Sequence, residues 1–202
     1  TRHFPTSQIV NVRDKLFMID CGEGAQLQFR KSHLKFSRLN HIFISHLHGD
    51  HCFGLLGLIS TLNLLGRTAE LHIHSPKGLE TLLTPMLDFF NRQMTYKVLF
   101  HEFDTKEPML IYEDRSLTVT TIPLRHRMPC CGFLFAEKRR PNHIIREMVD
   151  FYQVPVYELN RIKNRRSRVL SRKAWEVIRG ISYGDRTISM DYTGTHRGEN
   201  ED

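Results

Sequence analysis

Ser45-His46-Leu47-His48-Gly49-Asp50-His51 places three histidines and one aspartate within six consecutive positions. The stretch follows the short apolar run His41-Ile42-Phe43-Ile44, which predicts a buried strand. The polar side chains would then lie on a loop at the end of that strand, where groups held by a rigid sheet can converge. The alternative is an ordinary polar surface loop, but so dense a set of metal-ligand side chains behind a buried strand argues against it.

The chemistry of these side chains favours a transition metal. Imidazole nitrogen together with carboxylate oxygen suits Zn²⁺, Mn²⁺ or Fe, whereas Mg²⁺ and Ca²⁺ prefer sets of oxygen ligands. His46 and His48 are two positions apart, so an extended backbone turns both toward one side, where they can bind one ion. Asp50 and His51 are adjacent and must point elsewhere, toward a second ion.

Several segments of the chain resemble one known family. The pattern His46-x-His48-x-Asp50-His51 after a strand is similar to the signature of the metallo-β-lactamase superfamily. Three segments more narrowly resemble the RNase Z family of tRNA 3′-processing endonucleases. They are Asp20-Cys21-Gly22-Glu23-Gly24-Ala25-Gln26, residues 43–55, and Pro123-Leu124-Arg125-His126 with Cys131-Gly132-Phe133. The resemblance extends from Thr1 to about Asn164. It implies an α/β fold of the αββα sandwich type, which we expect to be incomplete in this chain.

The resemblance also implies roles for single residues. His126 follows an alternating strand, and although a lone histidine there is more often structural, the family has a metal-binding histidine at this position. His46, His48 and His126 would hold one ion, and Asp50 with His51 would begin the second site. Asp50 would also orient a water molecule and take its proton. Asp20 would either accept a ring N–H from a ligand histidine or cap a helix, and both can hold together.

The activity implied by the resemblance is zinc-dependent endonucleolytic cleavage of precursor tRNA on the 3′ side of the discriminator base. Two Zn²⁺ ions would activate a hydroxide for in-line attack on the phosphorus. Precursor tRNA is the expected partner, with a homodimer in the complete protein. Two alternatives stay open: another metallo-β-lactamase-type hydrolase acting on thioesters, sulfate esters or lactams, and a non-catalytic fragment that binds at most one metal ion.

The composition is that of a globular protein. A chain of 202 residues with 40% apolar and 25% charged residues suits one domain with a sizeable core. No apolar run approaches the ~20 residues needed to cross a membrane, so no membrane association is expected. The four cysteines include no C-x-x-C pair, which favours a reduced, cytoplasmic setting. The first residue is Thr1 and not Met, so we expect the start to be missing.

The net charge of +7 has a local origin. Residues 161–180 contain eight basic residues and one acid, which accounts for the whole excess, and the resemblance is lost there. We therefore expect a nuclease domain at 1–164 and a basic tail of uncertain fold at 165–202. Within the domain, residues 138–164 stand where the family has a tRNA-gripping arm. The cations there available for phosphates are Arg139, Arg140, Arg146, Arg161 and Lys163.

A complete RNase Z-like site needs a bridging aspartate and a final histidine further along the chain. Asp191 is the candidate bridge and His196 the candidate final ligand, but they are too close together for the family pattern. We expect that the second ion lacks ligands. We also expect that a missing partner layer leaves apolar side chains uncovered, such as those neighbouring the helix from Phe53 and those of the strand with Leu117 and Val119.

Hydrophobic periodicity predicts the elements around the site. His72 and His74 form a second His-x-His in mid-strand and are expected to be structural histidines with satisfied ring nitrogens. A helix is expected from Ser75-Pro76 toward Phe90, kinked or restarted at Pro85. The other expected helices are 22–31, 53–65 and 142–151, and the expected strands are 8–12, 15–19, 70–74, 97–103, 109–112, 116–123 and 131–136.

Overall fold

The computed structural model describes residues 4–138, 146–151, 153–157 and 159. The described residues fall into two compact units: the first contains residues 4–112 and 119–134, and the second contains 113–118 and the described residues from 135 onward. All residues of the candidate metal centre that the structure describes belong to the first unit. The expected boundary between a nuclease domain and a basic tail lies outside the described residues and stays a prediction.

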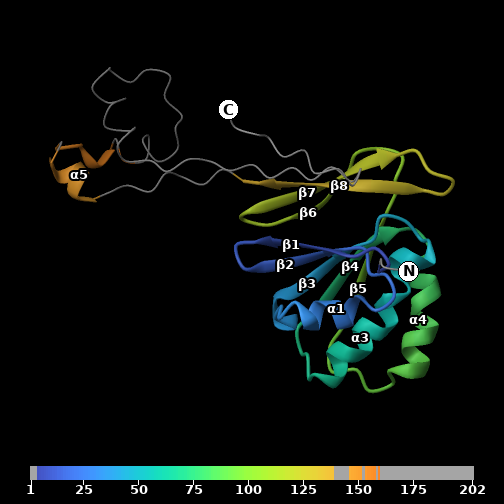
Figure 1. Ribbon diagram of the computed structural model, residues 1–202. Coiled ribbons are helices and arrows are strands. Elements are labelled where there is room, and N and C mark those ends of the chain that lie inside the picture. The colour runs from blue at the N-terminus through green and yellow to red at the C-terminus, as the bar shows by residue number, and fades with distance from the viewer. Residues whose placement is uncertain (1–3, 139–145, 152, 158, 160–202) are drawn as a thin grey trace. The chain divides into compact units, whose positions relative to one another are not determined.

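A five-stranded sheet forms the framework of the first unit (Figure 1). Its first two strands form the expected hairpin through Arg13 and Asp14, whose φ angles of 50° and 67° suit a two-residue turn between antiparallel strands. The next strands pair in parallel, so their carboxyl ends meet at one edge. The strands follow the order β1 (Gln8–Val12), β2 (Lys15–Ile19), β3 (Leu39–Phe43), β4 (Leu71–Pro76) and β5 (Val98–Phe103).

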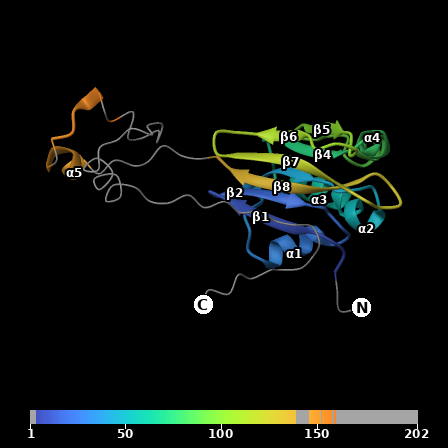
Figure 2. The ribbon, with the colours of Figure 1, turned by 90° about the horizontal axis from the view of Figure 1, so that it is seen from above.

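Helices cover one face of this sheet, as both ribbon views show (Figures 1 and 2). They are α1 (Ala25–Lys31), α3 (Gly54–Leu64) and α4 (Leu79–Phe90), with the short η1 (Phe36–Arg38) before β3 and α2 (Gly49–Cys52) before α3. Met18, Ile42 and Ile73 pack with Leu55 and Leu58 of α3, and all five side chains are fully buried. Burial of each such side chain stabilises the fold by about 1.5–3 kcal/mol, which makes the sheet a rigid support.

The other face of the sheet carries aromatic side chains, which contact those residues of a second sheet that belong to the first unit. The order of that sheet is β6 (Leu110–Glu113), β7 (Leu117–Leu124) and β8 (Cys130–Glu137). Within the first unit, the ring centroids of Phe43 and Phe133 are 5.5 Å apart, and those of Phe17 and Tyr112 are also 5.5 Å apart. Two sheets face to face with helices outside are the expected α/β architecture.

The expectation that Leu117 and Val119 would be uncovered is wrong. Their exposed fractions are 1% and 0%, because every second side chain along β7 is directed into the protein. The strand thus alternates as its sequence predicts, and its apolar face is buried.

The predicted start of α4 is also wrong. Ser75 and Pro76 lie in β4, and the helix begins at Leu79 after Gly78, whose φ of 108° few other residues adopt. The carboxylate of Glu102 accepts hydrogen bonds from the backbone N–H groups of Gly78 (2.8 Å) and Glu80 (3.1 Å), and so replaces the expected serine cap. Pro85 lies inside α4, so the helix does not restart there, and the alternative of a kink at Pro85 stays a prediction.

The described part of the second unit holds a turn and a short helix. Asp114 Oδ1 accepts hydrogen bonds from the backbone N–H of Ser116 (2.6 Å) and Leu117 (2.8 Å). The helix α5 spans Arg146–Phe151, whereas residues 142–145 of the expected helix lie outside the described residues. None of the helices that the structure describes combines the length and apolar character needed to cross a membrane.

Candidate metal centre

The His-x-His pair lies where β3 leaves the sheet. His46 is buried and His48 is exposed, and their nitrogens Nε2 and Nδ1 are 3.0 Å apart. His48 has an extended backbone (φ −75°, ψ 147°), which turns both imidazoles to one side as expected. Asp50 and His51 do not continue the loop, because they lie in the single-turn helix α2.

His126 approaches the same place from the connection between β7 and β8. One nitrogen from each of His46, His48 and His126 lies within 4.8 Å of the other two. The ring centroid of His126 is 4.9 Å from that of His46 and 5.1 Å from that of His48. A zinc ion needs Zn–N distances of about 2.0–2.1 Å, so small side-chain adjustments would bring the three nitrogens onto one ion.

Asp20 supports this loop from the end of β2. Its carboxylate is fully buried and accepts hydrogen bonds from the backbone N–H of Ser45 (2.8 Å) and from the Ser45 hydroxyl (2.9 Å). The Ser45 hydroxyl donates its one proton to Asp20, so it accepts from Nδ1 of His46 at 2.9 Å. That tautomer leaves the lone pair of Nε2 on His46 free for a metal ion.

His51 is held by the same carboxylate. Its Nδ1 lies 2.7 Å from Oδ2 of Asp20, and its Nε2 lies 3.6 Å from Oδ2 of the exposed Asp50. Burial alone lowers the pKa of His51, but the hydrogen bond and charge of Asp20 outweigh it and raise that pKa above its ordinary value. The expected ring N–H contact of Asp20 is therefore present. The helix-cap alternative is wrong for α1, whose cap is Gly24 without a side-chain hydrogen bond.

The imidazole of His46 is neutral at physiological pH. Burial, followed by the neighbouring His51, lowers its pKa to about 4. Neutral imidazole is the form that binds a metal ion, so this histidine needs no deprotonation.

Backbone contacts fix the glycine-rich segment against α2 and α3. Asp20 adopts the left-handed φ of 55°, and the N–H of Cys21 donates to the carbonyl of His51 at 2.8 Å. A Cβ atom at Gly54 would lie 2.1 Å from the carbonyl oxygen of Gly22, so only glycine permits this approach. Gly22 thus serves close packing beside the site, since its Cβ would lie 2.4 Å from the carbonyl oxygen of Asp50, whereas Gly24 provides the left-handed φ of 78° at the start of α1.

Other predicted site residues are not brought to the centre by the structure. Asp191, Arg139, Arg140, Arg161 and Lys163 lie outside the described residues. His196, the candidate final ligand, lies outside them as well. Arg146 is exposed at the start of α5 and lies 3.6 Å from Asp150, four positions along the same helix. Its role toward nucleic acid stays a prediction.

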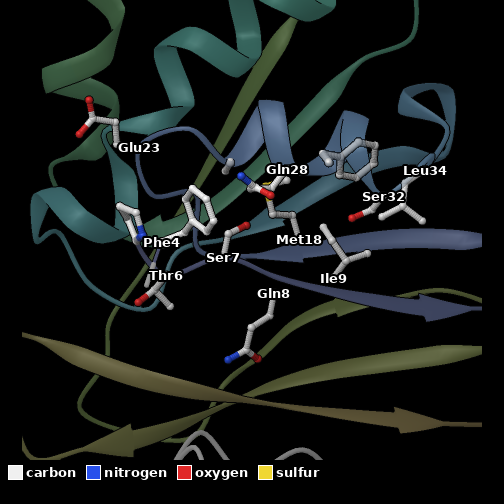
Figure 3. A pocket seen from close by; sticks show the side chains of 13 residues that line it. Phe4, Thr6, Ser7, Gln8, Ile9, Met18, Glu23, Gln28, Ser32 and Leu34 are labelled. Carbon is white, nitrogen blue, oxygen red and sulfur yellow. The ribbon is translucent and has the colours of Figure 1, made fainter. Parts of the chain in front are cut away.

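A hollow beside His126 was missed by the sequence analysis. It has a volume of about 570 Å³, and four cationic side chains line it: Lys77, Lys106, Arg125 and Arg127. The signal in the sequence was the pair of arginines that flank His126, whereas the lysines come from distant segments. A second hollow of about 450 Å³ lies between the segment before β1, the hairpin and α1 (Figure 3). Among the described residues, its lining includes one carboxylate, Glu23, and no histidine or cysteine, so these residues offer no metal site.

The second His-x-His pair lies within the sheet. His41, His72, His74 and His101 stack on neighbouring strands, with ring centroids 4.7 Å apart for His41 and His72, and 4.8 Å apart for His74 and His101. Burial, and then the neighbouring histidines, lower the pKa of His74 to about 3. The expectation of satisfied nitrogens is wrong at Nδ1 of His74, which is buried without a hydrogen-bond partner in the described part of the chain. The ring of His74 is held instead by stacking on the ring of Phe43 and on that of His101.

Comparison with known proteins shows which proteins this chain is similar to. A family model described as anti-Pycsar protein Apyc1 matches residues 1–142. A ribonuclease Z from Bacteroides fragilis is 82% identical over 164 residues, which are 81% of this chain and 54% of the relative. A ribonuclease Z from Bacteroides thetaiotaomicron is 80% identical over 164 residues, 81% of this chain and 52% of the relative.

A solved structure agrees with these sequence relatives. The crystal structure of human tRNase Z, short form (ELAC1), matches with a TM-score of 0.61 and 30% identity, over 68% of this chain and 62% of that chain. The chain spans about half the length of the curated relatives it matches.

Proposed function

Because the chain belongs to the ribonuclease Z family of the metallo-β-lactamase fold, within the group that the Apyc1 model describes, we propose that it acts as a zinc-dependent endoribonuclease on precursor tRNA. The cut would fall on the 3′ side of the discriminator base. The observation that carries the proposal is the convergence of His46, His48 and His126 within 4.8 Å, beside a buried Asp20 that orients the neighbouring ligands.

The residues present fit zinc. His46, His48 and His126 would hold one ion, because three nitrogens converge and the buried member is neutral. Asp50 and His51 would begin a second site, since Nε2 of His51 faces the exposed carboxylate of Asp50 at 3.6 Å. When bound, zinc supplies positive charge that polarises a phosphoryl oxygen and lowers the pKa of a bound water molecule.

The protein's own groups would orient the reactants and move a proton. We assign Asp50 the role of general base, because its side chain is 65% exposed and open to an approaching substrate. Asp20 and Ser45 contact Nδ1 of His51 and of His46, which holds each imidazole in one tautomer and leaves its Nε2 as the nitrogen that would bind a metal ion. These contacts are made before substrate binds, and they reduce the reorganisation needed during the reaction.

The finer features of the proposal rest on the family. Precursor tRNA as substrate is supported by the ribonuclease Z relatives and by the human tRNase Z structure. We further propose a homodimer, which the family resemblance implies, and a cytoplasmic location, which the four free cysteines favour. Two further roles belong to this proposal: the cations of the arm would contact phosphates, and Asp191 would bridge the two metal ions.

Incubation of the purified chain with zinc and a precursor tRNA that carries a 3′ trailer tests the proposal. A product that ends at the discriminator base, is lost with a chelator and returns with added zinc would support the proposal. Hydrolysis of a thioester or lactam in place of RNA would favour another metallo-β-lactamase-type activity. Binding of one zinc ion with no hydrolysis of any substrate would favour the non-catalytic alternative, which is consistent with the two ligands that the described residues offer a second ion.

A further inference from the structure

The hollow beside His126 is built from three separate segments of the first unit. Residues 76–77 follow β4, residues 103–106 follow β5, and residues 123–130 connect β7 to β8. His126 belongs both to this lining and to the histidine group of the metal centre. The hollow therefore opens next to the place where a phosphodiester would be cut.

The turn at Lys77 and Gly78 is fixed near the metal loop. Glu102 accepts hydrogen bonds from the N–H groups of Gly78 and Glu80, so the turn is held to β5. A Cβ atom at Gly78 would lie 3.8 Å from Cδ1 of Leu47, the residue between His46 and His48. The hollow and the histidines are thus parts of one continuous surface.

The charges in the hollow are not compensated. Lys77, Lys106, Arg125 and Arg127 are exposed, and within the part of the chain that the structure describes none of them forms an ion pair. Among the described residues of the lining, the one carboxylate is that of Asp104, whose Oδ1 already accepts a hydrogen bond of 3.0 Å from the backbone N–H of Lys106. Four unpaired cations around one hollow attract an anion with more than one charge.

The size and lining of the hollow indicate which anion it fits. Its volume of about 570 Å³ lies within the range of small-molecule sites, about 300–1,000 Å³. The lining also includes the apolar side chains of Leu124, Met128 and Pro129. A free phosphate ion would fill a small part of this space and leave the apolar wall unused, whereas a nucleotide strand offers phosphates for the cations and sugar or base for the wall.

We infer that this hollow binds the phosphate groups of an RNA strand that runs past His126. The inference rests on the proposed function, and it places RNA contacts on Lys77, Lys106, Arg125 and Arg127 in addition to the arm.

The first experiment measures which lysines RNA protects. The chain in chelator-containing buffer is treated with an acylating reagent, with and without single-stranded RNA of about four nucleotides, and modified lysines are identified by mass spectrometry. We expect RNA to reduce the reactivity of Lys77 and Lys106 and to leave Lys31 and Lys35 unchanged. Reactive Lys77 and Lys106 in the presence of RNA, or equal protection of Lys31 and Lys35, would overturn the inference. So would equal protection by inorganic phosphate, which would assign the hollow to a free anion.

The second experiment measures the salt dependence of RNA binding. Each phosphate contact on a single strand contributes about 0.7 to the slope of log affinity against log salt concentration. Lys77→Gln combined with Lys106→Gln should reduce the slope by about 1.4, because two contacts are lost. The matched control is Lys31→Gln combined with Lys35→Gln, two exposed lysines outside the hollow, which should leave the slope unchanged. Equal slopes in both double variants would contradict the inference.

These measurements separate the inference from the proposed function, because binding is measured without metal. A chain that cleaves precursor tRNA while Lys77 and Lys106 stay reactive refutes the inference alone. A chain that protects these lysines but cleaves nothing supports the inference and refutes the proposed function.

Discussion

The chain contains two His-x-His pairs, and the structure uses them in opposite ways. His46 and His48 lie beyond the end of β3, where the backbone leaves the sheet, and their rings meet His126 around one point. His72 and His74 lie within β4, and their rings stack against His41 and His101 on the neighbouring strands.

The difference shows that the position of the motif relative to the strand end decides its use. Within a strand, alternate side chains stand side by side on one face, so imidazoles from adjacent strands stack in rows. Beyond the strand end, the backbone can turn a ring toward a ligand from another segment. The His-x-His spacing alone does not separate the two cases, whereas the predicted strand bounds, which place His72 and His74 in mid-strand, do.

The largest expected difference between the two regions is in catalysis. Asp50→Ala should reduce turnover of precursor tRNA about 10²–10⁴-fold, the usual contribution of a general base, with RNA affinity nearly unchanged. The matched control is Glu70→Ala, since Glu70 lies 3.9 Å from His72 in the stacked group. Turnover numbers and dissociation constants of the three proteins provide the measurement. Near wild-type turnover by the Asp50 variant would remove Asp50 from the mechanism.

Zinc affinity should distinguish the two groups next. His48→Ala removes a proposed ligand and should weaken the tightest zinc binding by more than about 100-fold, beyond the 10–100-fold typical of an outer hydrogen bond. His101→Ala changes an equally exposed histidine of the stacked group and should leave zinc binding intact. Calorimetric titration measures both constants. If His101→Ala loses zinc and His48→Ala keeps it, the assignment of the two groups is reversed.

The support of the metal loop by Asp20 gives a smaller effect. Asp20→Asn keeps the shape but replaces one accepting oxygen by an amide, which opposes the N–H of His51 or the donors of Ser45. We expect zinc affinity to fall about 10–100-fold. Asp104→Asn, a carboxylate of the neighbouring hollow, is the control. An Asp20 variant with unchanged zinc affinity would show that the ligand tautomers do not depend on this carboxylate.

The stacked group should be visible in the pH dependence of stability. Because the pKa of His74 is lowered to about 3 in the folded state, the unfolded chain binds more protons between pH 6.5 and 3. Stability that depends on neutral His74 is therefore present above pH 6.5 and is lost as the pH falls. His74→Phe retains an aromatic ring and should reduce the loss between pH 7.5 and 5 by about 1–2 kcal/mol, measured by urea unfolding at each pH.

His33→Gln, a change at an exposed histidine outside the stacked group, should leave that pH dependence as in the wild type. An equally steep loss in the His74 variant would mean that other groups cause it.

Local signals in the sequence predicted the strands and those candidate site residues that are close together in the sequence, from His46 to His51. The β1 and β2 strands have the predicted bounds because alternation and a tight two-residue turn are both encoded locally. The start of α4 was not predictable in this way, because Glu102 supplies its cap from another strand. The same reason applies to Asp20, whose choice between helix cap and histidine partner depends on the pairing of β2 with β3. The cationic hollow escaped prediction because its side chains come from three distant segments.

His126 lies roughly 80 positions beyond His48 in the sequence, and only the folded chain brings them together. In the unfolded chain a zinc ion would find His46 and His48 without their third partner, so it binds the folded state preferentially. An ion at one hundred times its dissociation constant then stabilises the fold by about 2.7 kcal/mol. The melting temperature of the chain should therefore rise with zinc concentration, and the supply of metal would govern how much of the protein survives in the folded form.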